Sequence, residues 1–147
     1  MEEREAPRWH SGWFIVPWQV IFRDVDSFGH VNNAVYLSYF EWARAQLWFE
    51  LTGGSRPSDI GFIVARAEID FLQPIGMEPI DIRVRIGEMR NTSFETLYEI
   101  RKGDGRQLAA TGRVVAVMFD WETNVKTPVT DEFRRTVRLL QEGAESL

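Results

Sequence analysis

One polar segment of the sequence gathers most of the residues that could do chemistry. It holds Asp24, Asp26, Ser27, Gly29, His30, Asn32 and Asn33. The chain has no cysteine, which excludes thiol nucleophiles, disulfides and thiolate zinc sites. It also lacks the G-x-S-x-G, P-loop, H-E-x-x-H and Gly-rich dinucleotide motifs. The chemistry open to this segment is therefore that of carboxylates with polar neighbours.

The polar segment ends where a helix is predicted to begin. Asn32 or Asn33 is a good N-cap, and residues 34–51 contain no glycine or proline before Gly53. The first N–H groups of a helix have no partner within it, so they bind anions and polarise carbonyl groups. Removing one such donor to a developing oxyanion costs about 3–4 kcal/mol in measured cases. A substrate carbonyl at the N–H of Asn33 or of its neighbours would be polarised in this way.

Asp26 lies seven residues before Asn33, across a turn at Gly29. Its carboxylate could lie on the other side of the same carbonyl and act as a general base on water or as a nucleophile. This combination suits acyl transfer to water. On spacing alone a structural interpretation is the commoner one, with both aspartates in Asx turns, His30 as a hydrogen-bonding loop residue and the asparagines as caps.

The spacing Asp24-Val-Asp26 also begins two motifs that the rest of the segment does not support. A calcium-binding EF-hand loop needs oxygen ligands at its fifth and twelfth positions, which here are Phe28 and Val35. A phosphorylated-aspartate motif needs a small residue where Phe28 stands. No metal site is expected.

The residues around the predicted helix indicate its place in the fold. Twelve of the nineteen aromatic residues fall between Trp9 and Phe49. Only three residues within 34–51 are charged, among them Glu41 and Arg44, which are spaced as an i,i+3 ion pair. A helix that is apolar on nearly all sides is predicted to be buried.

The other predicted elements are mostly strands. A first strand is predicted at residues 15–22, and the two-residue period of strands or a continuous apolar run appears at 67–71, 80–86, 94–100 and 108–120. The short breaks between the last four strands predict an antiparallel meander. A last helix is predicted to begin at Thr130, with Phe133, Val137 and Leu140 on one side. This order predicts an α+β fold in which a sheet curves around one hydrophobic helix, and the open face or edge of that sheet predicts a homodimer.

The composition fits one soluble globular domain. The 147 residues are 44% hydrophobic and 27% charged, no apolar run is long enough to span a bilayer, and the charged start is unlike a signal peptide. A net charge of −5 argues against general nucleic-acid binding. We expect a cytoplasmic protein without a membrane partner, with an N-terminal extension at 1–13, a domain at 14–141 and a tail at 142–147.

The segment FRDVDSFGHVNNAVYLSYFEWAR resembles the hot-dog-fold acyl-CoA thioesterases of the 4-hydroxybenzoyl-CoA thioesterase group, which open with D-x-D-x-x-G-x-V before a helical tyrosine. The resemblance continues through ARAEIDFLQPI, EMRNTSF and YEIRKGDGRQLAATGRVV to a closing T-P-x-T-x-x-F-R, over residues 19–135. It implies a five-stranded antiparallel sheet wrapped around one long hydrophobic helix. It also implies a homodimer or homotetramer with active sites at the subunit interface.

The resemblance further implies roles for individual residues. Asp26, the second acid of D-x-D, would be the catalytic carboxylate, and the Asn33 N–H would polarise the thioester carbonyl. Arg90 takes the position of a basic residue that binds CoA phosphates, with Ser93 beside it. The family's next two basic positions are Asn91 and Thr92 here.

The H-V-N-N-x-x-Y stretch is also similar to plant-type acyl-ACP thioesterases, which combine an aspartate, an asparagine and a histidine in D-x-N-x-H. His30 matches that pattern and is a third catalytic candidate, but Phe28 stands at the asparagine position. The remaining candidates for substrate binding are Phe28, Gly29, Tyr36 and Glu41.

The expected activity is hydrolysis of an acyl-CoA thioester. No metal or other cofactor is expected, since CoA is part of the substrate. Three alternatives stay open: an acyl-ACP thioesterase, a hydratase or dehydratase of the same fold, and a non-enzymatic acyl-CoA-binding or regulatory module. Such hydratases often carry H-x-P-G, which this chain lacks.

Overall fold

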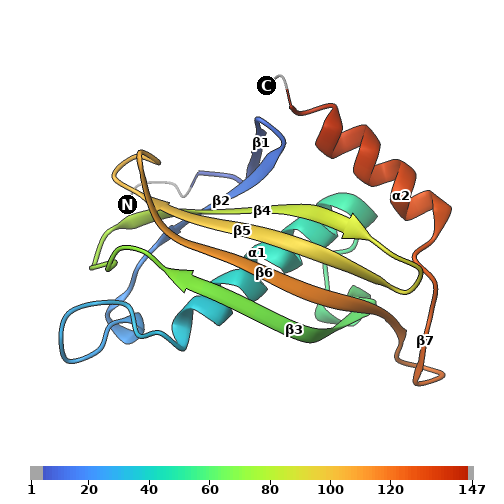
Figure 1. Cartoon of the computed structure of the whole chain (residues 1–147), viewed down its shortest axis with the longest axis horizontal. Helices are drawn as coiled ribbons and strands as arrows, with labels where there is room; N and C mark the ends of the chain where they lie inside the picture. The colour runs from blue at the N-terminus through green and yellow to red at the C-terminus, as the bar shows by residue number, and fades with distance from the viewer. Residues whose placement is uncertain (1–4, 146–147) are drawn as a thin grey trace.

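The computed structural model describes residues 5–145 and shows one long helix packed against an antiparallel sheet (Figure 1). The helix α1 spans Val35–Thr52 and ends at Gly53, whose φ of 78° lies in the left-handed region. This confirms the helix predicted over 34–51. The predicted N-cap at Asn32 or Asn33 is wrong, because the N-cap residue is Ala34. Asn32 still serves the helix start, since its Oδ1 accepts a hydrogen bond from the Ala34 N–H at 2.9 Å.

The sheet confirms the α+β class. Its described strands are β1 (Arg8–His10), β2 (Trp13–Gln19), β3 (Phe62–Phe71), β4 (Pro79–Met89), β5 (Ser93–Lys102), β6 (Gln107–Asp120) and β7 (Val125–Lys126). Their order is β1-β2-β4-β5-β6-β3, with β7 paired to β6. The five long strands are the five-stranded sheet that the resemblance implies, and the short β1 and β7 extend it.

The predicted meander holds for β4, β5 and β6 but is wrong for β3. β3 pairs with β6 at the edge of the sheet, from Phe62 opposite Met118 to Phe71 opposite Ala110. β4 pairs instead with β2 and β5. The loop over residues 72–78 therefore joins the edge strand β3 to β4, and β5 and β6 lie between these two strands in the sheet. Alternation of apolar residues shows which side chains share a face of a strand, but it does not say which strands are neighbours.

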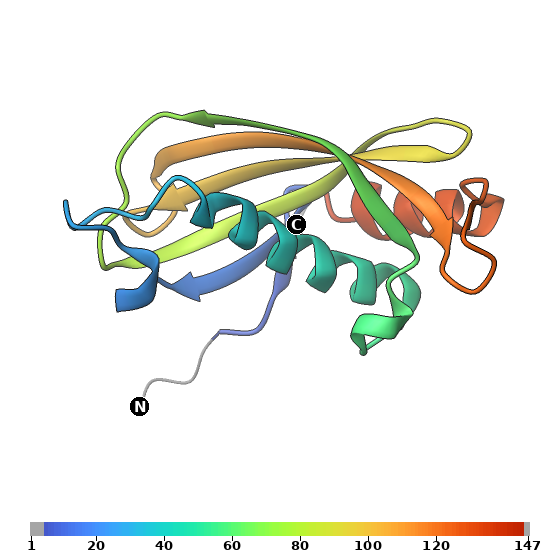
Figure 2. The ribbon, with the colours of Figure 1, turned by 90° about the horizontal axis from the view of Figure 1, so that it is seen from below.

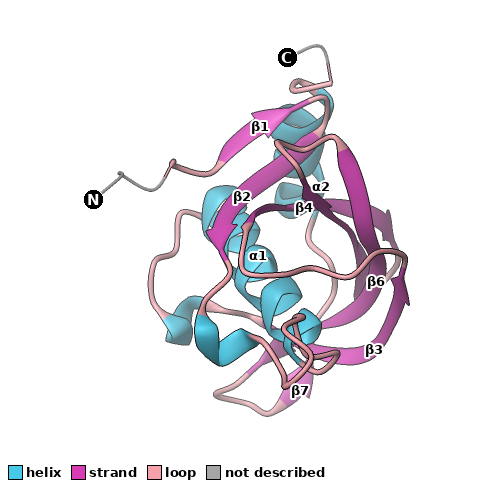
Figure 3. Cartoon of the chain, turned by 90° about the vertical axis from the view of Figure 1, so that its left-hand side faces the viewer, coloured by secondary structure: helices cyan, strands magenta, loops and turns pink. Residues whose placement is uncertain are grey.

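The helix α1 packs against the sheet on one side only (Figure 2). Its buried residues are Tyr36, Tyr39, Phe40, Ala43, Arg44, Leu47, Trp48 and Leu51. On the other side Leu37 and Trp42 are 47% and 45% exposed. The prediction of a helix buried on nearly all sides is therefore wrong for a single chain, because the sheet curves around only part of the helix (Figure 3).

The predicted ion pair between Glu41 and Arg44 is also wrong. Arg44 is buried and its Nη1 donates to the Tyr98 hydroxyl at 3.0 Å, whereas Glu41 is exposed. The Arg44 guanidinium also lies over the Phe62 ring, 5.8 Å from its centroid. Arg44 faces the sheet, so its partner comes from a strand and not from the neighbouring helical turn.

The turn between β1 and β2 meets the C-terminal end of the described chain. The Gly12 N–H donates to the Ala144 carbonyl at 3.1 Å. The short helix α2 (Asp131–Val137) begins as predicted at Thr130, whose Oγ1 accepts the Phe133 N–H at 3.1 Å, and continues as a π-helical turn, η3 (Arg138–Glu142). Within the predicted extension, Arg8–His10 form β1 and Trp13 begins β2, so these residues lie in the sheet. No helix within residues 5–145 is long and apolar enough to cross a membrane.

Candidate active site

An open cavity of about 340 Å³ lies at the N-terminal end of α1. Its walls come from the polar segment, the first turn of α1, the end of β3 and the loop that follows β3. The lining residues are Asp26, Phe28, His30, Val31, Asn33, Tyr36, Phe71, Leu72, Gln73 and Pro74. The structure thus brings five predicted site residues to one cavity: Asp26, Phe28, His30, Asn33 and Tyr36.

Asp24 anchors the polar segment and does not line the cavity. Its carboxylate is buried, and Oδ2 accepts hydrogen bonds from the Tyr39 hydroxyl at 2.7 Å, the Ile21 N–H at 3.2 Å and the Trp18 indole at 3.4 Å. Its backbone carbonyl accepts the Asn32 N–H at 2.9 Å. Burial and the bond to Asp24 raise the pKa of Tyr39, which keeps the donor proton in place. Asp24 therefore holds both the start and the end of the segment that carries Asp26.

Asp26 lies in the turn that the sequence predicts. Its Oδ1 accepts the Phe28 N–H at 2.9 Å, and its backbone carbonyl accepts the Gly29 N–H at 3.0 Å. Gly29 has a φ of 79°, a conformation that favours glycine. The turn uses only one carboxylate oxygen, because Oδ2 accepts no hydrogen bond within residues 5–145. The structural and the catalytic interpretations of Asp26 are therefore compatible.

Asn33, which lines the same cavity as Asp26, offers a free backbone donor. The N–H groups on either side of it are engaged, since Asn32 donates to Asp24 and Ala34 donates to the Asn32 side chain. The Asn33 N–H donates to no atom in the described part of the chain. It precedes α1, where the helix dipole adds positive potential. Asp26 and Asn33 both line the cavity.

The other predicted residues of the polar segment differ in position. His30 lines the cavity and is exposed, and its backbone carbonyl accepts the Asp26 N–H at 2.9 Å. Phe28 also lines the cavity but is 84% exposed, so it does not cover the carboxylate of Asp26. Gly29 shapes the turn without lining the cavity.

On α1, Tyr36 lines the cavity and Glu41 does not. Tyr36 is 3% exposed, and its ring meets Phe71 edge-on with centroids 4.9 Å apart. Burial raises the pKa of its hydroxyl. Glu41 is exposed on the side of α1 that the sheet leaves open, because five positions turn the helix well away from Tyr36.

The predicted phosphate-binding residues Arg90 and Ser93 lie away from the cavity within one chain. The Arg90 N–H donates to the Ser93 carbonyl at 2.8 Å in the turn between β4 and β5. Figure 1 shows this turn and the loop of residues 25–31 at opposite ends of the sheet. The Arg90 guanidinium pairs with Glu88 at 3.0 Å and with Glu95 at 3.7 Å.

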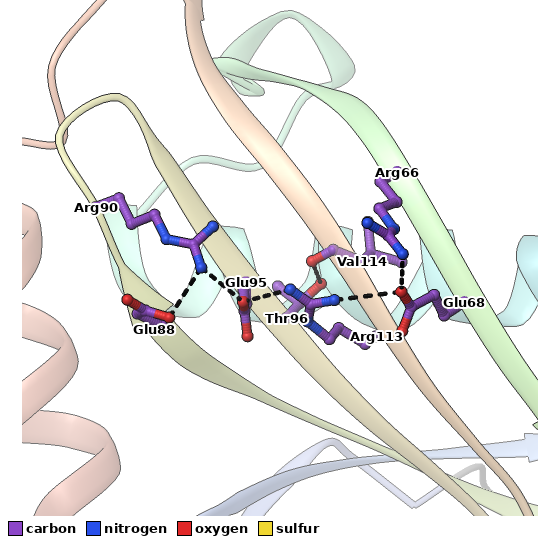
Figure 4. Close-up of polar contacts among 8 residues, drawn as sticks. All are labelled: Arg66, Glu68, Glu88, Arg90, Glu95, Thr96, Arg113 and Val114. Atoms are coloured by element: carbon purple, nitrogen blue, oxygen red, sulfur yellow. Dashed lines mark hydrogen bonds and ion pairs between the residues drawn. The ribbon is translucent and has the colours of Figure 1, made fainter.

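These pairs belong to a chain of charges on the face of the sheet away from α1 (Figure 4). Glu95 also accepts from Arg113 at 2.7 Å, Arg113 reaches Glu68 at 3.4 Å, and Glu68 pairs with Arg66 at 2.6 Å. The hydrogen bond from Arg113 holds the pKa of Glu95 below its usual range. A phosphate at Arg90 would therefore compete with carboxylates that already engage it.

The wall that comes from the end of β3 could not be predicted from the sequence. Four more residues line the cavity although they lie 45 to 48 positions after Asp26 in the sequence: Phe71, Leu72, Gln73 and Pro74. A hydrogen bond from the Val31 N–H to the Ile75 carbonyl, at 2.8 Å, holds the two loops together. Gln73-Pro74 marks a turn in the sequence, but no local signal links that turn to the polar segment. No three His, Asp or Glu side chains of residues 5–145 gather as a metal site would require.

Comparisons with known proteins agree with this fold. The family model described as Thioesterase-like superfamily matches residues 20–137. The chain is 30% identical to the acyl-CoA thioesterase YbgC of Helicobacter pylori over 83 residues, which are 56% of this chain and 62% of that protein. Among solved structures, a thioesterase from Thermus thermophilus complexed with coenzyme A and Zn has a TM-score of 0.77 and 31% identity, covering 89% of this chain and 95% of that one.

A more distant structure shows the fold alone. The 4-hydroxybenzoyl CoA thioesterase, in an Asp-to-Asn mutant complexed with 4-hydroxybenzoyl CoA, has a TM-score of 0.74 at 17% identity, covering 85% of this chain and 98% of that one. The hot-dog fold that the resemblance implies is thereby confirmed. With the family model matched over most of its length, the chain belongs to the Thioesterase-like superfamily and is an enzyme of the thioester hydrolase class.

Proposed function

We propose that the enzyme hydrolyses acyl-CoA thioesters with Asp26 as the catalytic carboxylate and the Asn33 N–H as the oxyanion donor. The observation that carries this proposal is that both residues line one cavity at the N-terminal end of α1. The acyl-CoA thioesterase YbgC and the coenzyme A complex of the Thermus protein support CoA as the carrier. A cytoplasmic location stays a prediction from the sequence.

The geometry allows two routes for Asp26. In one route Asp26 takes a proton from a water molecule whose oxygen attacks the thioester carbon. In the other route an Asp26 oxygen attacks that carbon, and water then hydrolyses the resulting anhydride. In both routes the carbonyl oxygen becomes an oxyanion that the Asn33 N–H stabilises, the carbon–sulfur bond breaks, and CoA leaves as a thiolate. We assign His30, which is exposed at the same cavity, the role of orienting the attacking water.

We further propose that a second copy of the chain completes the site. Arg90 and Ser93 cannot serve the cavity of their own chain, because they lie at the other end of the sheet. The β3 strand is an edge of the sheet, and the end of the molecule that carries the cavity exposes large apolar side chains, among them Phe22 at 83% and Phe28 at 84%. Such surfaces are usually covered by a partner. A homodimer would let Arg90 of one chain meet CoA phosphates at the cavity of the other.

A CoA-release assay with a thiol reagent tests the activity. The wild-type protein is expected to release CoA from at least one member of an acyl-CoA panel with saturation kinetics. Binding of acyl-CoA without release of CoA would make the protein a binding module and contradict the proposal. Turnover of acyl-ACP with no turnover of the matching acyl-CoA would assign the other carrier.

A further inference from the structure

The polar segment is anchored by few buried residues. Within residues 21–34, Asp24 and Val31 are the two that are buried, and the others, Asp26 and Asn33 included, are half-buried or exposed. Val31 belongs to the apolar core. Asp24 instead brings a carboxylate inside the protein, where the cost of its burial depends on the donors around it. The position of the proposed catalytic groups therefore depends on what holds Asp24.

Asp24 lies at the base of a small hairpin formed by residues 24–32. At that base the Asn32 N–H donates to the Asp24 carbonyl at 2.9 Å. Further along the hairpin the Asp26 N–H donates to the His30 carbonyl at 2.9 Å, and an antiparallel bridge lies between the two bonds. A movement of Asp24 would therefore displace Asp26 and, through Asn32, the free N–H of the next residue.

The Tyr39 hydroxyl is the closest donor to the Asp24 carboxylate, and it comes from α1. It donates to Oδ2 at 2.7 Å, compared with 3.2 Å for the Ile21 N–H and 3.4 Å for the Trp18 indole. No Lys, Arg or His side chain of residues 5–145 forms an ion pair with Asp24. Uncharged donors alone therefore offset the burial of this carboxylate, and Tyr39 is the one that ties the hairpin to the long helix.

The two sides of this bond differ in how easily they can move. Tyr39 is 4% exposed, and its ring packs against the ring of Tyr36 with centroids 6.3 Å apart. The chain just before Asp24 lies at the surface, where Ile21 and Phe22 are 41% and 83% exposed. Without the Tyr39 hydroxyl, the hairpin would shift and turn the Asp24 carboxylate toward water, while α1 would stay in place.

We propose that Tyr39 is a positioning residue of the hydrolysis and acts through Asp24. Tyr39 does not line the cavity, so its hydroxyl acts on the reaction only by holding the hairpin. The inference rests on the proposed function, since Asp26 and the Asn33 N–H are the groups that the hairpin holds. The cavity wall at residues 71–74 does not depend on this bond, so its loss is expected to lower kcat and to leave KM nearly unchanged.

Tyr39→Phe tests the inference, because it removes the hydroxyl and keeps the ring. In the CoA-release assay its kcat is expected to fall at least tenfold, with KM within threefold of the wild-type value. Tyr98→Phe is the matched control: it also removes a buried hydroxyl that is bonded to a charged side chain, Arg44 at 3.0 Å, but it lies on β5 and outside the cavity. The control is expected to lose stability and to keep the wild-type kcat. Wild-type kcat in Tyr39→Phe, or an equal loss of kcat in Tyr98→Phe, would overturn the inference.

A double-mutant cycle shows whether Tyr39 acts through Asp24. Asp24→Ala removes the acceptor and is expected by itself to lower kcat at least tenfold. In that background the Tyr39 hydroxyl has lost its partner, so adding Tyr39→Phe is expected to change kcat by less than threefold. Wild-type kcat in Asp24→Ala, or the same tenfold effect of Tyr39→Phe in both backgrounds, would contradict action through Asp24.

Amide hydrogen exchange, followed residue by residue with NMR, measures the position of the hairpin without any turnover. The N–H groups of Asp26 and Asn32 are bonded within the hairpin. In Tyr39→Phe they are expected to exchange at least fivefold faster than in the wild type, and in Tyr98→Phe at the wild-type rate. Equal exchange in Tyr39→Phe and the wild type would show that the hydroxyl does not hold the hairpin, and the inference would fail.

The inference and the proposed function fail in different ways. If Asp26→Asn keeps the wild-type kcat, the proposed function fails, whereas faster exchange in Tyr39→Phe still shows that Tyr39 holds the hairpin. If Asp26→Asn loses kcat and Tyr39→Phe keeps it, the proposed function stands and the inference alone fails.

Discussion

Replacing Gly29 by alanine is expected to disturb the Asp26 carboxylate more than the fold. Gly29 closes the turn that begins at Asp26, with an N–H···O distance of 3.0 Å and a φ of 79°. An alanine Cβ would meet no atom within 4 Å, so the cost comes from the left-handed backbone alone, about 1–2 kcal/mol. The turn can relieve this cost by changing φ, which breaks the hydrogen bond to Asp26 and moves its carboxylate relative to the Asn33 N–H.

Gly53 provides a matched control for this substitution. It has a φ of 78° and equally open space around its Cβ position, but it lies at the other end of α1. Both Gly→Ala variants are expected to lower the midpoint of thermal unfolding by about 2–4 °C for each kcal/mol lost. Only Gly29→Ala is expected to lower kcat/KM for an acyl-CoA, by at least tenfold in the CoA-release assay. If Gly29→Ala kept the wild-type kcat/KM, or if Gly53→Ala lost as much kcat/KM as Gly29→Ala, the turn at Gly29 would not be what positions the Asp26 carboxylate.

Substitutions at three further positions test the fold and its charges. Gly112→Ala is expected to lower the free energy of unfolding by about 1–3 kcal/mol, because the new Cβ would lie 2.2 Å from the Phe40 ring, whereas Gly61→Ala meets its nearest atom at 3.4 Å and serves as the control in urea unfolding. Arg44→Met removes a buried cation that has no carboxylate partner within residues 5–145 while filling its space, so its stability is expected to equal or exceed that of the wild type. Arg44→Ala leaves a cavity, so its free energy of unfolding is expected to fall by about 2 kcal/mol or more. Equal free energies of unfolding for the two variants would show that Arg44 does not act by filling space. Backbone hydrogen bonds lower the pKa of Asp59 from its ordinary 3.8 to about 2, so the stabilisation it contributes is present above pH 4 and lost as the pH falls toward 2. The free energy of unfolding, measured for both proteins from pH 6 to pH 2, should therefore be higher in the wild type than in Asp59→Asn at pH 6 and become similar at acid pH. A difference between the two proteins that grows as the pH falls would contradict a lowered pKa of Asp59.

The polar segment was the most informative part of the sequence. Turn chemistry at Asp26 and Gly29 and the uninterrupted stretch after Asn33 predict the order turn, free N–H and helix, which the structure contains. These signals are local, because each depends on contacts between residues a few positions apart. The N-cap shifted by one or two positions to Ala34, since the Asn32 side chain bonds the N–H just before the first turn.

The parts that sequence reasoning missed depend on contacts between distant segments. Arg44 fits an ion pair with Glu41 by spacing, but the curvature of the sheet brings Tyr98 closer to it. β3 alternates like its neighbours, yet only the chain's path through residues 72–78 places it next to β6. The same path brings Phe71 to the cavity, so four of the ten residues that line it had no signal near the polar segment.

The proposed catalytic role of Asp26 depends on its carboxylate, which Asp26→Asn removes with little change in shape. Asparagine can still accept the Phe28 N–H that holds the turn at 2.9 Å, so the fold and the oligomeric state are expected to persist. In this variant kcat for the best acyl-CoA is expected to fall at least a hundredfold, which corresponds to about 2.7 kcal/mol in the activation barrier. Asp70→Asn, at an exposed position of β3 outside the cavity, is expected to keep wild-type kcat. A kcat for Asp26→Asn within a few-fold of the wild type would remove Asp26 from the mechanism.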